Sequence, residues 1–136
     1  KCTILKWDLR IAGGERIPSL NGCRALSRQQ RTMILRARVG CVWPGVRRVR
    51  HGIATSDVCD GCGAVETMEH LLLRCTAFAD ARRDMLAAYR ALGIFPDSLE
   101  TLLWPQGSAR TRERTLVSLC VFLEQAGLTS RLFCAR

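Results

Sequence analysis

The sequence contains no run of 18 or more apolar residues, so it offers no candidate for a membrane-spanning helix. Its first six residues do not have the layout of a secretory signal peptide. It also lacks a GxSxG elbow, a glycine-rich phosphate loop, an HExxH or HxxEH motif and a carboxylate cluster that would hold two magnesium ions. These absences argue against a membrane protein, a secreted protein and an enzyme with a small-molecule substrate, and we expect an intracellular protein of the cytoplasm or nucleus.

Acidic residues are also absent between Gly22 and Ser56, where eight of the arginines lie. The net charge of the whole chain is +9, so most of the excess charge falls in this window. Arginine suits forked contacts to phosphate oxygens and stacking on bases. We therefore expect RNA or DNA as a partner, and the alternative is a set of solvated charges without a partner. The expected contacts come from Arg28, Arg31, Arg36, Arg38, Arg47, Arg48 and Arg50.

Three cysteines and a histidine occur with metal-ligand spacing, as Cys59-x2-Cys62-x7-His70-x4-Cys75. Three thiolates and one imidazole complete a tetrahedral Zn²⁺ shell, so we expect one structural zinc ion. Glycines beside Cys62 let the backbone curl and direct amide hydrogens at the thiolates. On an ideal α-helix, side chains five residues apart point about 140° away from each other. The helix that carries His70 should therefore loosen or end at Cys75.

Two other interpretations of this motif compete with a structural zinc site. A disulfide framework is compatible with an even count of 8 cysteines. However, the strand and helix that flank a redox-active Cys-x2-Cys pair are not evident here. A catalytic zinc ion could use Glu69 as a general base, but a closed shell of four protein ligands leaves no position for water. The remaining cysteines share no spacing and are interpreted as thiols of a reducing compartment: Cys2, Cys23, Cys41, Cys120 and Cys134.

Apolar periodicity predicts a mainly α fold, a small helical domain organised around the zinc knuckle after an irregular N-terminal connector. Helices are expected over residues 28–39, 77–92, 99–104 and 109–126. In the first, Met33, Ile34 and Ala37 should face the core and the arginines the other side. In the last, the inward set is Leu116, Val117, Cys120, Val121 and Leu123. Residues 41–45 should form a turn, and Trp43 is interpreted as a core anchor rather than a base-stacking residue.

The order of these features resembles the C-terminal zinc-binding region of non-LTR (LINE-like) retrotransposon polyproteins. The residues that carry the resemblance are the arginine-bearing segment ending in Arg36-Ala37-Arg38-Val39-Gly40, the cysteine–histidine motif with Glu66-Thr67-Met68-Glu69 before His70, and Ala79-Asp80-Ala81-Arg82-Arg83. The resemblance spans about residues 24–127. It implies zinc ligation by Cys59, Cys62, His70 and Cys75, and a missing upstream reverse transcriptase as a further partner. No polymerase or ribonuclease H carboxylates occur in this chain, so no activity is assigned to it.

These observations give an expected domain organisation: a connector over residues 1–26 from a missing upstream region, a helical zinc-binding domain over 27–127 and a C-terminal tail over 128–136. By resemblance, the domain helps a reverse transcriptase polyprotein to hold template RNA or target DNA. The alternative is a zinc-stabilised protein-interaction module that docks through Trp104 and residues 99–103, with no nucleic-acid contact.

Overall fold

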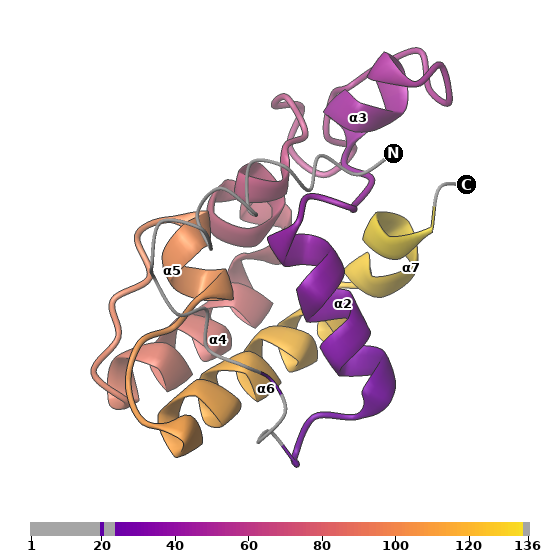
Figure 1. Ribbon diagram of the computed structural model, residues 1–136. Coiled ribbons are helices and arrows are strands. Elements are labelled where there is room, and N and C mark those ends of the chain that lie inside the picture. The colour runs from indigo at the N-terminus through magenta and orange to yellow at the C-terminus, as the bar shows by residue number, and fades with distance from the viewer. Residues whose placement is uncertain (1–19, 21–23, 135–136) are drawn as a thin grey trace.

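The computed structural model describes residue 20 and residues 24–134. Almost all of the expected connector over residues 1–26 lies outside this part. The described part is mainly helical (Figure 1), which confirms the predicted fold class. Its α-helices are α2 (Arg28–Arg38), α3 (Gly45–Arg50), α4 (Ala79–Ala91), α5 (Leu99–Leu103), α6 (Ala109–Gln125) and α7 (Leu128–Phe133). A π-helix (His70–Arg74) and a 3₁₀ turn (Thr76–Phe78) precede α4.

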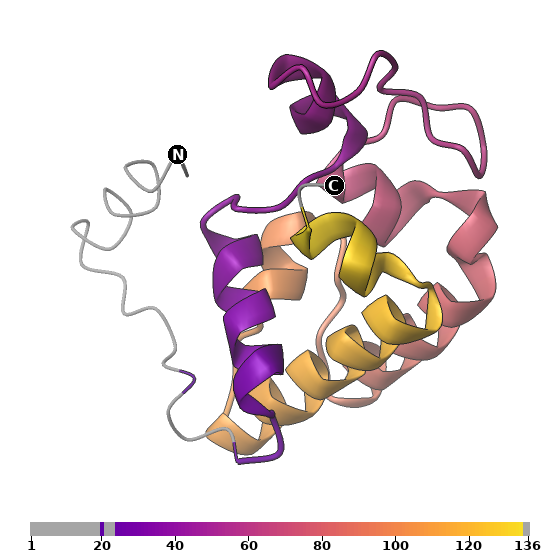
Figure 2. The same cartoon turned by 90° about the vertical axis from the view of Figure 1, so that its right-hand side faces the viewer.

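Helix α6 lies at the centre of the packing and contacts α4, α5 and α7, while α2 packs against α5. Figure 2 shows α2 and α4 on opposite sides of α6, and α3 stands apart from this bundle in both views. Tyr89 of α4 lies in the apolar core and donates a 2.8 Å hydrogen bond to the Leu102 carbonyl. Burial raises the pKa of this phenol, so Tyr89 stays protonated as a donor. None of the described helices combines the length and apolar character that crossing a bilayer requires.

Local sequence signals account for most helix ends. Ser27 and Gln30 form the predicted reciprocal capping box, in which Ser27 Oγ accepts from the Gln30 amide and Gln30 Oε1 accepts from the Ser27 amide. Serines also cap α5 and α6, through Ser98 and Ser108. Gly127 adopts a positive φ of 69°, which ends α6 at the position that the glycine predicted.

Two short helices were not predicted. Residues 45–50, which begin at the last residue of the expected turn, form α3. Residues 128–133 of the expected tail form α7, which buries Leu128, Leu132 and Phe133. Helix α6 buries Leu119 and Phe122 beside the predicted Leu116, Cys120 and Leu123. The prediction for Val121 was wrong, since its side chain is 42% exposed.

The largest departure on α2 concerns Arg38, which the pattern placed on the exposed face. Its side chain is buried, with only 3% of its surface exposed. Its Nε donates a 2.8 Å hydrogen bond to the Leu103 carbonyl, and its guanidinium lies over the Trp104 ring. The expectation of an exposed Arg38 was therefore wrong, because a carbonyl and a ring from a distant segment give the charged group a buried position.

Candidate metal centre and arginine face

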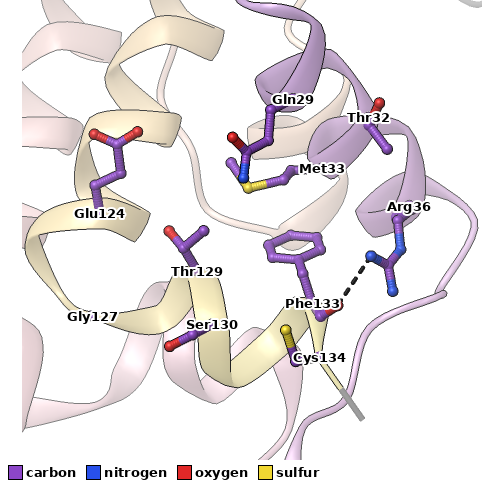
Figure 3. A pocket seen from close by; sticks show the side chains of 10 residues that line it. All are labelled: Gln29, Thr32, Met33, Arg36, Glu124, Gly127, Thr129, Ser130, Phe133 and Cys134. Carbon is purple, nitrogen blue, oxygen red and sulfur yellow. Dashed lines mark hydrogen bonds between the residues drawn. The ribbon is translucent and has the colours of Figure 1, made fainter.

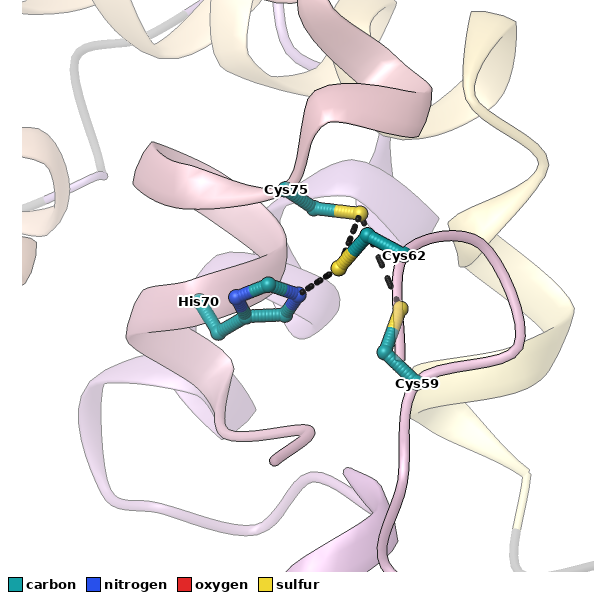
Figure 4. A group of neighbouring side chains, drawn as sticks. All are labelled: Cys59, Cys62, His70 and Cys75. Carbon is teal, nitrogen blue, oxygen red and sulfur yellow. Dashed lines mark hydrogen bonds between the residues drawn. The ribbon is translucent and has the colours of Figure 1, made fainter. Parts of the chain in front are cut away.

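The first two ligands lie on a tight hairpin over residues 57–66. Val58 and Val65 form an isolated antiparallel bridge. The Cys59 amide donates to the Ala64 carbonyl at 2.6 Å, and the Gly63 amide donates to the Cys59 carbonyl at 2.8 Å. Gly63 adopts a φ of +80°, which L side chains rarely take, so the turn requires glycine there. The hairpin directs Cys59 and Cys62 toward the same point (Figure 4).

Gly61 brings the hairpin against the segment that follows the metal helix. A Cβ placed on Gly61 would lie 2.5 Å from the Ala77 Cβ, 3.6 Å from the Cys75 Sγ and 3.8 Å from the Cys59 Sγ. A side chain would therefore push the two ligand-bearing segments apart. Gly61 and Ala77 together set how closely the thiols can approach.

The other two ligands lie at the two ends of the π-helix (His70–Arg74). The Cys75 amide donates to the His70 carbonyl at 2.7 Å, which is the i to i+5 bond of a π turn. This wider turn stacks Cys75 over His70, whereas α-helical geometry would separate the two side chains around the helix. The backbone is extended at Cys75, so the helix ends there. The prediction that the helix loosens or ends at Cys75 is confirmed.

The four donor atoms converge on one point (Figure 4) and all lie within 4.8 Å of one another. Cys75 Sγ is 3.6 Å from Cys59 Sγ and 3.7 Å from Cys62 Sγ, and Cys62 Sγ is 3.1 Å from His70 Nε2. Sulfur ligands about 2.3 Å from a tetrahedral zinc ion stand about 3.8 Å apart, close to both sulfur–sulfur distances. The four residues predicted from the sequence are therefore close enough to hold one metal ion.

Backbone amides around the cluster point at sulfur, as the glycine-rich loop predicted. The Ala64 amide is the largest influence on Cys62, and it lowers the pKa of this exposed thiol. Burial raises the pKa of Cys75 to about 11, although the Ala77 amide acts in the opposite direction. A metal ion binds the thiolate form of each cysteine, so amide donors that stabilise the thiolates favour metal binding. Burial of Cys75 disfavours its thiolate until the metal supplies the compensating charge.

Arg82 of α4 stabilises the end of the π-helix. The Arg82 residue is buried and its guanidinium donates to three carbonyls, at 2.9 Å to Leu72, 2.7 Å to Cys75 and 3.1 Å to Leu71. Carbonyls at a helix C-terminus have no partners within the helix, so a charged donor is well suited to them. Arg82 fixes the backbone that carries His70 and Cys75 without contacting the donor atoms.

A half-buried ion pair connects the hairpin to α7. Glu66 is fully buried and pairs with Arg131, whose Nη1 also lies 3.4 Å from Asp60 Oδ2 inside the knuckle. Glu66 Oε1 also accepts a 2.9 Å hydrogen bond from the Gly45 amide at the start of α3. This one carboxylate therefore joins the metal hairpin, α3 and α7.

The predicted arginines fall into three groups in the described part. Arg28 and Arg50 are exposed, as is Arg24 of the same window. Four are half-buried and donate to backbone carbonyls: Arg31 to Leu26, Arg36 to Phe133, Arg47 to Gly40 and Val42, and Arg48 to Trp43, Arg131 and Cys134. Arg38 is buried and leaves the exposed set. These carbonyl bonds hold the half-buried guanidinium groups in fixed positions.

Arg36, Arg47 and Arg50 come together from α2 and α3. The pKa of Arg47 is lowered, first by burial and then by the positive charges of Arg36 and Arg50. The Arg47 guanidinium lies 4.1 Å from the centre of the Trp43 ring, and His51 meets the same ring edge-on. Trp43 is half-buried rather than a core anchor, because its ring serves as a platform for Arg47.

The surface expected for the protein-interaction alternative is not available. Leu102, Leu103 and Trp104 are buried in the core and leave no exposed ridge. Among the remaining cysteines that the structure describes, Cys120 and Cys134 are free thiols, as expected. Cys41 is disulfide-bonded, which corrects its interpretation as a thiol.

Sequence reasoning missed Glu66, Arg82 and Arg131 as supports of the metal centre. Glu66 and Arg82 lie within the segments that carry the resemblance, but nothing there distinguished them from solvated charges. Arg131 lies in the segment that was expected to be a tail. No family model, curated protein or solved structure matches the chain.

Proposed function

We propose that the chain is a structural-zinc module that binds nucleic acid, comparable to the C-terminal zinc-binding region of LINE-like retrotransposon polyproteins. The observation that carries the proposal is the convergence of Cys59, Cys62, His70 and Cys75. The hairpin of this cluster is joined through Glu66 and the Gly45 amide to α3, which bears three of the arginines. Three sulfurs and one imidazole nitrogen suit Zn²⁺ better than magnesium or calcium, which prefer oxygen ligands. Four protein ligands leave no position for a catalytic water, so the ion has a structural role.

Nucleic acid is the proposed partner because the arginines of α2 and α3 are poorly compensated by acidic groups and two of them, Arg36 and Arg47, are held in position. Among the described residues, Arg28, Arg36, Arg47 and Arg50 have no ion pair. The carbonyl bonds of Arg36 and Arg47 reduce the entropy lost when a phosphate is bound. By resemblance, the module helps an upstream polymerase of the same polyprotein hold template RNA or target DNA in the cytoplasm or nucleus, and it has no catalytic activity of its own.

Metal analysis tests the first half of the proposal. The purified chain should contain one zinc ion, and a chelator should unfold the hairpin and π-helix, since structural zinc contributes roughly 10–16 kcal/mol at neutral pH. A Cys62→Ser variant should lose most of this affinity, whereas Cys134→Ser, an exposed thiol outside the cluster, should retain it. A chain that melts identically with and without chelator would refute the zinc assignment.

A salt titration tests the second half. If three to seven arginines meet phosphates, the logarithm of affinity for single-stranded RNA should fall with the logarithm of salt at a slope of about −2 to −5. Arg28→Gln and Arg50→Gln should each weaken binding and lower the slope by about 0.7. Both arginines are exposed, so the changes should leave folding intact. Arg90→Gln, which replaces an exposed arginine of α4, is the charge-matched control. An affinity for RNA that does not change with salt concentration would remove nucleic acid from the proposal.

A further inference from the structure

A cavity of about 570 Å³ lies between α2 and the junction of α6 with α7 (Figure 3). Met33 and Phe133 give it apolar walls, and Gln29, Thr32 and Thr129 contribute an amide and two hydroxyls. Ligand-binding clefts commonly have volumes in this range and combine apolar surface with a few polar groups. This volume exceeds that of a single nucleobase, so the cavity has room for one together with its sugar.

A polar atom in this cavity lacks a partner. Thr129 Oγ1 is buried and has no hydrogen-bond partner in the part of the chain that the structure describes. A buried hydroxyl without a hydrogen bond is destabilising, so such groups are usually paired. The oxygen is covered in this structure, so a base in the cavity would pair with it only after the Thr129 side chain changes rotamer.

The charges at the cavity distinguish its two ends. Arg36 lies at one end, where its Nη1 donates a 3.0 Å hydrogen bond to the Phe133 carbonyl, and Glu124 lies at the other (Figure 3). Arg47 and Arg50 add positive charge near Arg36. A phosphate is therefore favoured outside the Arg36 end, whereas a neutral base is favoured in the cavity between Arg36 and Glu124.

We infer that the chain binds single-stranded nucleic acid, with one unpaired base in the cavity between α2 and α7 and the neighbouring phosphates on Arg36, Arg47 and Arg50. This inference rests on the proposed function and adds a strand preference to it. A base that is paired within a duplex is stacked and cannot enter a cavity without being extruded. Duplexes then gain only the phosphate contacts.

The test is fluorescence anisotropy with the zinc-loaded full chain and four probes of roughly 12 nucleotides: single-stranded RNA, single-stranded DNA and the two corresponding duplexes. Either single strand should bind about tenfold more tightly than its duplex, which corresponds to the stacking of one base. Ser130→Phe places a ring at the mouth of the cavity from an exposed position of α7. It should weaken single-strand binding by about tenfold and leave duplex binding unchanged.

Ala87→Phe, at an exposed position of α4, is the matched control and should change neither affinity. A second readout does not depend on a variant: a 4-thiouridine-labelled RNA should crosslink to peptides that contain residues 29–36 or 129–134. Equal affinity for single strands and duplexes, unchanged single-strand binding by Ser130→Phe, or crosslinks confined to other peptides would overturn the cavity assignment. If salt-dependent binding persists in those cases, the proposed function stands; absence of any binding overturns both.

Discussion

Replacement of Arg82 by methionine tests how the metal centre is held together. Methionine keeps much of the apolar stem but removes the three hydrogen bonds to the Leu71, Leu72 and Cys75 carbonyls. Hydrogen bonds from a charged donor contribute about 1.5–3 kcal/mol each, but bonds within one group are not additive. We expect a loss of about 3–5 kcal/mol in the free energy of unfolding, a large part of the stability of a small domain.

The same change should weaken the metal site, because these carbonyls belong to the π turn that brings His70 to Cys75. Loss of a group that orients metal ligands typically lowers metal affinity 10- to 100-fold. Urea unfolding of the zinc-loaded protein measures the first effect, and competition between Co²⁺ and Zn²⁺, followed by the Co²⁺ absorption bands, measures the second.

Arg83→Met is a closely matched control for Arg82→Met. Arg83 is the next residue on α4 and pairs at 2.6 Å with Asp80, but the two side chains are 74% and 94% exposed. Such surface pairs contribute about 0–1 kcal/mol. If Arg82→Met and Arg83→Met have the same unfolding midpoint and the same Co²⁺ affinity, Arg82 does not support the centre and this reasoning is refuted.

Two further predictions concern close packing and a buried thiol. Gly61→Ala should lower the free energy of unfolding by about 1–3 kcal/mol and weaken Co²⁺ binding, because its Cβ would lie 2.5 Å from that of Ala77. Adding Ala77→Gly should restore Co²⁺ binding. A double variant that binds Co²⁺ as weakly as Gly61→Ala would contradict this prediction. Burial, assisted by Glu124, raises the pKa of Cys120 to about 12, so iodoacetamide at pH 8 should modify the exposed Cys134 first. A thiol in the unfolded chain ionises near pH 8.5, so the raised pKa of Cys120 stabilises the folded protein below about that pH, and this contribution falls as the pH rises toward 12. Equal alkylation rates of Cys120 and Cys134 in the folded protein would refute the burial of the Cys120 thiol.

The features that the sequence predicted well depend on residues close together in the chain. The capping box that starts α2 spans Ser27 to Gln30, and the glycine that ends α6 directly follows its last turn. The metal ligands fall within 17 residues, so the hairpin and one helical segment are enough to gather them. Signals of this kind do not depend on which segments meet in the folded chain.

The features that were missed depend on contacts between distant segments. Arg38 bonds to a carbonyl 65 residues away, and Glu66 meets an arginine at the same separation. Apolar periodicity predicted exposure for Arg38 and nothing in the sequence marked Glu66, whereas in each case a specific partner makes burial favourable. Helix α7 was missed because Gly127 was interpreted only as an end, although the apolar residues beyond it, Leu128, Leu132 and Phe133, pack into the core.

The ion pair between Glu66 and Arg131 joins the metal centre to the cavity. Glu66 belongs to the hairpin, because its amide donates to the Asp57 carbonyl at 2.7 Å. Arg131 belongs to α7, whose Thr129, Ser130 and Phe133 line the cavity between α2 and α7. Arg131 is 37% exposed, so loss of Glu66 leaves a partly solvated charge and costs less than the roughly 3–5 kcal/mol of a fully buried pair. If the hairpin unfolds without metal, Arg131 loses this partner and α7 loses part of its anchoring, so a structural ion would control binding at a site that it does not contact.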